Sequence, residues 1–149
     1  MEGRDNDTFL ESLMDTSLYS MGAYFSDQHP ELVDEVSSRP DFAVLCYSGF
    51  LKERDKDEMR HGLRIPANTP PILLAHSSDD NEKVGGSNAE NSAFMYLALK
   101  RAGIPAELHI YATGDHDFGV RKNDKLPSSW TGLCLNWLKS FKLLRVPEN

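Results

Sequence analysis

The feature that most constrains the fold is one predicted helix between two apolar, strand-like segments. The first segment covers residues 72–76 and the second covers 106–111, while the sequence between them favours a helix from about Ala89 to Ala102. A succession of strand, helix and strand predicts two parallel strands joined by a right-handed crossover. We therefore expect an α/β domain with a small, mostly parallel sheet flanked by helices.

Two further elements are predicted around this unit. The apolar run at 42–47 is typical of a strand that is buried on both faces of a sheet. A last helix is expected from about Ser129 to Phe141. Its apolar residues recur at helical spacing and should form its core face: Trp130, Leu133, Cys134, Trp137, Leu138 and Phe141.

Capping residues fix the limits of the first predicted helix. Ser87 or Asn88 suits the N-cap, and Gly103 suits the position that closes the helix. From the apolar pattern we expect one face of this helix to be packed in the core, through Phe94, Leu97 and Ala98.

Length and charge limit the classes of protein to consider. The 149 residues, 40% of them hydrophobic, suit one domain over residues 1–149, short for a complete α/β enzyme. The formal net charge of -7 gives a nucleic acid or an anionic membrane no electrostatic attraction. The acidic start of the chain lacks the apolar segment of a secretory signal, so a cytoplasmic location is expected.

The two cysteines show neither metal-ligand nor redox spacing. Cys46 falls in the first predicted strand and Cys134 in the last predicted helix, so both are expected to be buried thiols. No cofactor, metal site or disulfide is predicted.

Polar residues follow the two strands that bracket the helix. Asp79 and Asp80 come after 72–76, and His116 lies in the glycine-bounded turn 114–119 after 106–111. The carboxyl ends of parallel strands are where open α/β sheets keep their sites. A carboxylate that orients an imidazole, and an imidazole that takes a proton from a hydroxyl, are two parts of a serine-hydrolase triad. Such a turn should expose the imidazole.

Several segments, in their order and spacing, resemble the C-terminal half of an α/β-hydrolase esterase. They are Arg39-Pro40-Asp41-Phe42-Ala43-Val44-Leu45, Thr69-Pro70-Pro71, the stretch from Tyr96 to Tyr111 and the histidine turn. The group with the most similar segments is the bacterial esterases and lipases similar to dienelactone hydrolases and acetylxylan esterases. The resemblance covers about residues 39–144, which leaves 1–38 as a divergent N-terminal segment, and it implies a truncated α/β-hydrolase fold.

The resemblance also implies roles for the polar residues. The triad acid of these esterases ends a motif of the form HGxxD, which falls on His76-Ser77-Ser78-Asp79-Asp80 and selects Asp80, with Asp79 as the alternative. Their base lies in a turn of the form GGHGFG, which selects His116. Here Asp115 and Asp117 stand in place of the glycines beside the histidine.

The nucleophile is the part of the triad that the sequence defines least. These esterases carry their serine in a GxSxG elbow. The segment Leu18-Tyr19-Ser20-Met21-Gly22 keeps the serine and the glycine after it but lacks the first glycine, so Ser20 is the first candidate. Ser48, at the end of the first predicted strand, is the second. The HGGG-type loop that supplies the oxyanion hole has no counterpart in the chain.

Two functions follow from the resemblance. The first is a carboxylic ester hydrolase that acts on short-chain acyl esters, a small-molecule substrate. The alternative is a catalytically incompetent remnant that serves as an oligomeric binding or structural module. A half-sized sheet leaves the edge of strand 42–47 open, to be covered by residues 1–38, by a second copy or by another chain. A homodimer is the simplest expectation.

Overall fold

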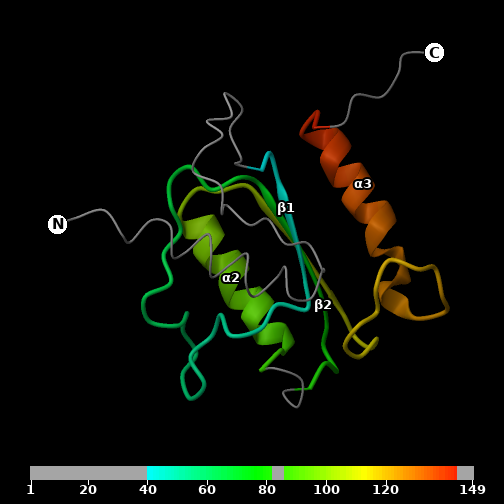
Figure 1. The fold of residues 1–149 in the computed structure, drawn as a ribbon, viewed down its shortest axis with the longest axis horizontal. Coiled ribbons are helices and arrows are strands. Elements are labelled where there is room, and N and C mark those ends of the chain that lie inside the picture. Colours follow the sequence, from blue (N-terminus) through cyan, green and yellow to red (C-terminus); the bar gives the residue numbers. More distant parts are fainter. Residues whose placement is uncertain (1–39, 82–85, 144–149) are drawn as a thin grey trace, which may run out of the picture.

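The computed structural model describes residues 40–81 and 86–143 of the chain. In chain order the elements are β1 (Ala43–Cys46), β2 (Ile72–Ser77), α2 (Ala89–Arg101), β3 (Ala106–Tyr111), the short 3-10 helix η1 (Leu126–Ser129) and α3 (Trp130–Ser140) (Figure 1). All three strands and both helices that the sequence predicts are present. No helix within the described ranges has the length and apolar character needed to cross a membrane.

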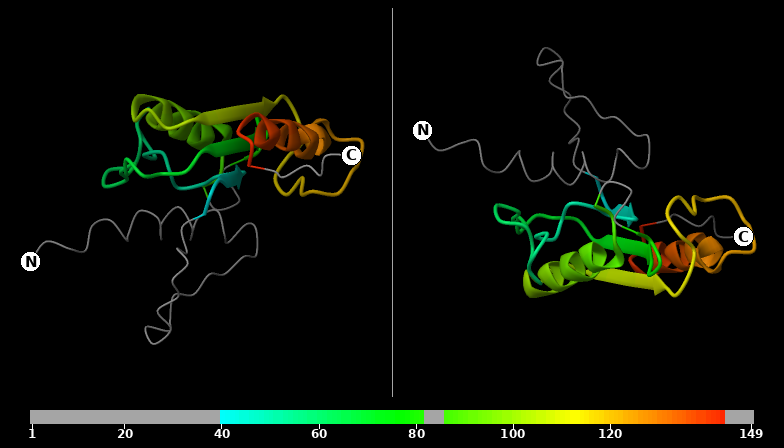
Figure 2. Two further views of the ribbon diagram at one scale, coloured as in Figure 1. Left: turned by 90° about the horizontal axis from the view of Figure 1, so that it is seen from above. Right: turned by 90° about the horizontal axis from the view of Figure 1, so that it is seen from below.

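The strands form a parallel sheet in the order β1-β2-β3. Ile72 of β2 lies opposite Ala43 of β1 on one side and Ala106 of β3 on the other. All residues of β2 are buried, as expected of a central strand covered on both faces. Because the strands are parallel, their carboxyl ends meet at one end of the sheet, where the loop after β3 also lies (Figure 2).

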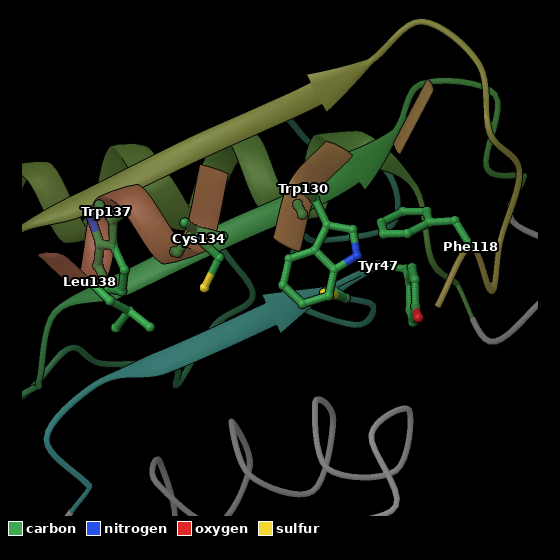
Figure 3. Packing of buried hydrophobic residues seen from close by; sticks show 9 residues of the cluster. Tyr47, Phe118, Trp130, Cys134, Trp137 and Leu138 are labelled. Atoms are coloured by element: carbon green, nitrogen blue, oxygen red, sulfur yellow. The ribbon is translucent and has the colours of Figure 1, made fainter. Parts of the chain in front are cut away.

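Side chains alternate between the two faces of the sheet, so each face packs against its own helix. Helix α2 covers one face and α3 the other (Figure 1). The α2 face buries Leu45, Ile72, Leu74, Met95 and Leu99. The α3 face buries Cys46, Leu73, Ala75, Trp130, Cys134, Trp137 and Leu138 (Figure 3).

Helix α2 begins and ends with the expected capping residues, but its core face differs from the prediction. The side chain of Asn88 accepts a hydrogen bond from the Asn91 N–H at 3.3 Å, and Gly103 has a φ of 74° just after the helix. The expectation that Leu97 faces the core is wrong, since it is 41% exposed, and Phe94 and Ala98 are only partly buried.

The reason is that polar side chains share the buried face of α2 with Met95 and Leu99. Asn91 Oδ1 accepts hydrogen bonds from the backbone N–H groups of Leu51 and Lys52, both at 2.9 Å. Ser92 is fully buried and binds a histidine of β2, described below. The spacing of apolar residues cannot locate such a face, because half of the buried residues of α2 are polar. A polar side chain is buried only where it finds a hydrogen-bond partner, and here those partners are distant in the sequence.

The core face of α3 largely follows the prediction. Trp130, Cys134, Trp137 and Leu138 are buried, whereas Leu133 is only partly buried. Phe141 was expected in this face, but it lies beyond the last helical residue and is 39% exposed.

Both cysteines are buried free thiols, as predicted. Burial raises the pKa of the Cys46 thiol to about 12, which keeps it in the unreactive protonated form.

Candidate active site

The candidate site lies where the carboxyl ends of the three strands meet. Tyr47 follows β1, Asp80 follows β2, and the turn that carries His116 follows β3. The rings of Tyr47 and His116 are in contact, with 4.9 Å between their centroids. The sheet topology therefore brings together residues that are far apart in the sequence.

Asp80 and His116 form a direct hydrogen bond. Nδ1 of His116 lies 2.8 Å from Oδ2 of Asp80, whose side chain is fully buried. The His116 side chain is 16% exposed. The turn therefore buries most of the imidazole against Tyr47, where the sequence suggested an exposed ring.

This bond sets the chemistry that His116 can perform. Because the Asp80 carboxylate accepts, Nδ1 of neutral His116 carries the proton and donates it. The lone pair of Nε2 is then available to take a proton, which is the tautomer that a general base requires. Nε2 lies 3.6 Å from Oδ1 of Asp117, a side chain that is 82% exposed.

Asp79, the alternative acid, binds the backbone of the histidine turn. Its two carboxylate oxygens accept hydrogen bonds from the N–H groups of Gly114, at 3.2 Å, and Asp115, at 2.8 Å. The hydrogen bond from Asp115 is the main cause that lowers the pKa of Asp79 below its ordinary value. The two neighbouring carboxylates thus have different tasks, since Asp80 contacts the imidazole and Asp79 holds the turn.

The turn needs a left-handed backbone on both sides of the histidine. Asp115 and Asp117 have φ angles of 60° and 58°. They stand where the motif GGHGFG, with which the turn was compared above, has a glycine on either side of the histidine. Aspartate tolerates this conformation better than most residues, because its short side chain bonds to nearby backbone. Accordingly, Oδ1 of Asp115 accepts from the N–H of His116 at 2.9 Å.

Gly114, at the start of the turn, leaves no space for a side chain. A Cβ atom there would overlap the side chains of Pro127 and Ser77. We expect Gly114→Ala to lower the free energy of unfolding by about 1–3 kcal/mol and to displace the turn that carries His116. Thermal unfolding would measure the loss of stability, and the imidazole resonances of His116 would report the displacement.

Gly132 in α3 provides the matched control for this substitution. A Cβ atom at Gly132 meets no atom within 4 Å. Gly132→Ala should therefore raise stability by about 0.5–1 kcal/mol, because alanine favours a helix over glycine. A Gly114→Ala protein as stable as Gly132→Ala would contradict the close packing of this turn.

A second histidine, His76, also binds Asp80, a contact that the sequence does not predict. The ring of His76 is fully buried, with Nε2 at 2.9 Å from Oδ2 of Asp80 and Nδ1 at 2.7 Å from Oγ of Ser92. Oγ of Ser87 lies 2.8 Å from the same Asp80 oxygen. The sequence marked His76 in two ways, as a polar residue near the end of an otherwise apolar strand and as the first residue of the motif that selects Asp80.

Burial lowers the pKa of His76 below its ordinary value of 6.5, and this outweighs the opposing effect of Asp80. Below pH 6.5 the unfolded chain therefore binds a proton at His76 that the folded chain does not. The contribution to stability is complete above 6.5 and is lost as the pH falls from 6.5 toward the folded pKa. Urea unfolding at a series of pH values should show this loss.

Two histidine variants would test this pH dependence. His76→Gln removes the titrating group and should flatten the dependence below 6.5. His61 is exposed, so His61→Gln should leave the dependence as it is in the unaltered chain. Equal slopes in the two variants would show that His76 is not responsible.

The two candidate nucleophiles are not equally placed. Ser20 lies outside the described residues. Ser48 is 2% exposed, and its Oγ has no hydrogen-bond partner among residues 40–81 and 86–143, so it is not bonded to His116. For a metal, no group of three or more His, Cys, Asp or Glu side chains in these ranges is arranged to hold an ion.

Comparison with known proteins gives similarity at the level of structure. No protein-family model and no curated protein matches the sequence. An acetyl ester-xyloside bifunctional hydrolase from Caldicellulosiruptor lactoaceticus is 28% identical over 87% of the chain and 53% of its own length, with a TM-score of 0.64. A carboxylesterase from Lactobacillus plantarum is 15% identical over 76% of the chain and 49% of its own length, with a TM-score of 0.57.

A sugar hydrolase from Lactococcus lactis is 21% identical over 87% of the chain and 56% of its own length, with a TM-score of 0.53. At 15% and 21% identity the last two similarities concern the fold alone. The chain spans about half the length of each of these three proteins. The described part of the chain therefore corresponds to part of an esterase-like α/β-hydrolase fold.

Proposed function

We propose that the chain is a carboxylic ester hydrolase in which Asp80 orients His116 and His116 acts as the general base. The observation that carries this proposal is the 2.8 Å hydrogen bond between Nδ1 of His116 and Oδ2 of Asp80. It lies at the carboxyl ends of parallel strands, the usual position of active sites in open α/β sheets. The acetyl ester-xyloside hydrolase from Caldicellulosiruptor lactoaceticus, which is 28% identical, supports the same reaction class.

In the proposed reaction a serine hydroxyl attacks the ester carbonyl while Nε2 of His116 takes its proton. The tetrahedral intermediate collapses, the alcohol leaves with that proton, and an acyl-serine remains. A water molecule then attacks the acyl group, with His116 again as the base, and releases the acid and the free serine. Ser20 is the proposed nucleophile, with Ser48 as the alternative.

The proposed substrates are small esters with short acyl chains. The description of the Caldicellulosiruptor enzyme as acting on an acetyl ester supports a short acyl group.

The outer edge of β1 favours association with another copy of the chain. The N–H groups of Ala43 and Tyr47 donate to Pro71 and Ala75 on the β2 side, at 3.0 and 2.9 Å. In a parallel strand alternate residues point their backbone groups the other way, so those of Val44 face away from β2. Within the described ranges no strand pairs with this side of β1. We propose a homodimer that covers this edge.

Hydrolysis of p-nitrophenyl acetate by the full chain tests the proposed reaction. Turnover should be lost in His116→Ala and in Ser20→Ala, and kept in Ser48→Ala. His109→Ala is a matched control, because His109 binds Glu107 at 2.7 Å on β3 and does not contact Asp80. A fluorophosphonate probe followed by peptide mass spectrometry would identify the reactive serine directly.

The outcomes separate the proposal from its alternative. A folded chain with neither turnover nor probe labelling would favour the alternative, a catalytically incompetent remnant that serves as an oligomeric binding or structural module. Turnover that survives His116→Ala would overturn the assigned base. Light scattering should give twice the mass of one chain, and a monomer with a native spectrum would overturn the dimer.

A further inference from the structure

A buried chain of side chains reaches the same oxygen of Asp80 that His116 contacts. Ser92 of α2 contacts Nδ1 of His76, at 2.7 Å, and Nε2 of His76 contacts Oδ2 of Asp80, at 2.9 Å. Ser92, His76 and the Asp80 side chain are all fully buried. A group in this position cannot touch a substrate, so any effect it has on catalysis acts through Asp80.

The contacts define which nitrogen of His76 carries the proton. Asp80 as a carboxylate can only accept, so Nε2 of His76 must be the donor. Nδ1 of the neutral ring then accepts from the hydroxyl of Ser92. Each ring nitrogen thus has a partner, an acceptor for Nε2 and a donor for Nδ1. These two hydrogen bonds fix the ring between Ser92 of α2 and Asp80, which follows β2.

His76 stays neutral while it donates. Burial lowers its pKa, and the titratable groups that face it are Asp80 and His116. The Asp80 carboxylate therefore accepts hydrogen bonds from two imidazoles. That of His76 stays neutral, and that of His116 becomes protonated during the proposed reaction. The hydroxyl of Ser87, 2.8 Å from the same oxygen, is the other polar group at this position.

We propose that His76 is a positioning residue, which with Ser92 behind it holds Oδ2 of Asp80 toward Nδ1 of His116. This inference rests on the proposed ester hydrolysis. The fixed donor has two effects: it selects one rotamer of the carboxylate, and it withdraws part of the negative charge that would otherwise stabilise a protonated His116. Removal of the donor should change both.

The variants His76→Leu and His76→Gln separate these effects from packing. Leucine fills the space without a donor, and we expect kcat to fall roughly 10- to 100-fold, the loss seen when the hydrogen-bond partner of a metal-binding side chain is removed. KM should not change, because the residue does not reach the substrate. Glutamine keeps a donor near the position of Nε2 and should retain most of kcat. His109→Gln is the matched control, since it alters a histidine bound to a different carboxylate.

The split between kcat and KM distinguishes positioning from a merely structural role. Loss of a positioning residue lowers kcat at unchanged KM, and glutamine, which keeps the donor, should restore it. A residue that only packs would lower the melting temperature and leave kcat of the folded protein unchanged, which would overturn the proposal.

Imidazole NMR of the unaltered chain tests the inference without any turnover. His76 should appear at neutral pH as the neutral tautomer with the proton on Nε2. The Nδ1 proton of His116 should give a downfield resonance that shifts or disappears in Ser92→Ala and His76→Leu and persists in His76→Gln.

The result for the proposed function and the result for His76 can be told apart. A chain that hydrolyses no ester but shows these resonances contradicts the hydrolase proposal and supports the arrangement at Asp80. A proton on Nδ1 of His76, or an unchanged His116 resonance in both Ser92→Ala and His76→Leu, overturns the positioning role. Ser92→Ala provides that answer even where His76→Leu does not fold.

Discussion

Asp80→Asn is expected to lower kcat for ester hydrolysis by about 10⁴-fold, the loss typical of this substitution in a serine triad. The amide has nearly the shape of the carboxylate but no charge, so it cannot stabilise a protonated His116. Oδ2 of Asp80 now lies within 2.9 Å of atoms of His76, Ser87 and His116. If the NH2 group of the asparagine took the place of Oδ2, it would face other hydrogen-bond donors. Single-turnover kinetics with p-nitrophenyl acetate would measure the loss.

Asp79→Asn is the matched control for this prediction, since it makes the same change one residue away. Asp79 accepts from the backbone of the histidine turn and does not contact the imidazole. An asparagine can still accept one of those hydrogen bonds, so a much smaller loss of kcat is expected. A larger loss in Asp79→Asn than in Asp80→Asn would make Asp79 the triad acid.

Trp137→Ala is expected to reduce the free energy of unfolding by about 3–5 kcal/mol. Trp137 is 4% exposed and packs α3 onto the sheet, with its ring 6.4 Å from that of Phe42 and 5.3 Å from that of Phe141. Alanine would leave a cavity between helix and sheet (Figure 3). Since domains are stable by only about 5–15 kcal/mol, this one change can remove much of the total.

Urea unfolding followed by tryptophan fluorescence and circular dichroism would measure this loss. Leu135 lies on the same helix and is 44% exposed, so Leu135→Ala should change stability by less than about 0.5 kcal/mol. Equal effects of the two substitutions would mean that α3 is not held by its buried face.

The secondary structure could be predicted because its signals are local. The apolar runs before Ser48 and Asp79 predicted β1 and β2, and Asn88 and Gly103 predicted the limits of α2. The parallel orientation of β2 and β3 followed from the helix between them. Each of these inferences needs only neighbouring residues and the standard geometry of a strand–helix–strand unit.

The contacts of the site depended on residues far apart in the sequence. Motif spacing selected Asp80 over Asp79, but a spacing cannot say which carboxylate touches an imidazole and which binds backbone. The structure shows that Asp80 contacts His116 and that Asp79 contacts the N–H groups of Gly114 and Asp115. That division arises from how the turn after β3 lies across the end of β2.

The sequence by itself determined an α/β unit with a carboxylate pair and a histidine at the carboxyl ends of its strands. Only the tertiary structure decided which other buried side chains form hydrogen bonds with the Asp80 carboxylate. His76 begins the motif that selected Asp80, but the motif does not show what its ring contacts. Ser92 lay on a face of α2 that the apolar pattern did not mark. Both are buried because each satisfies the hydrogen bonds of the other, and that condition exists only once the helix packs on the sheet.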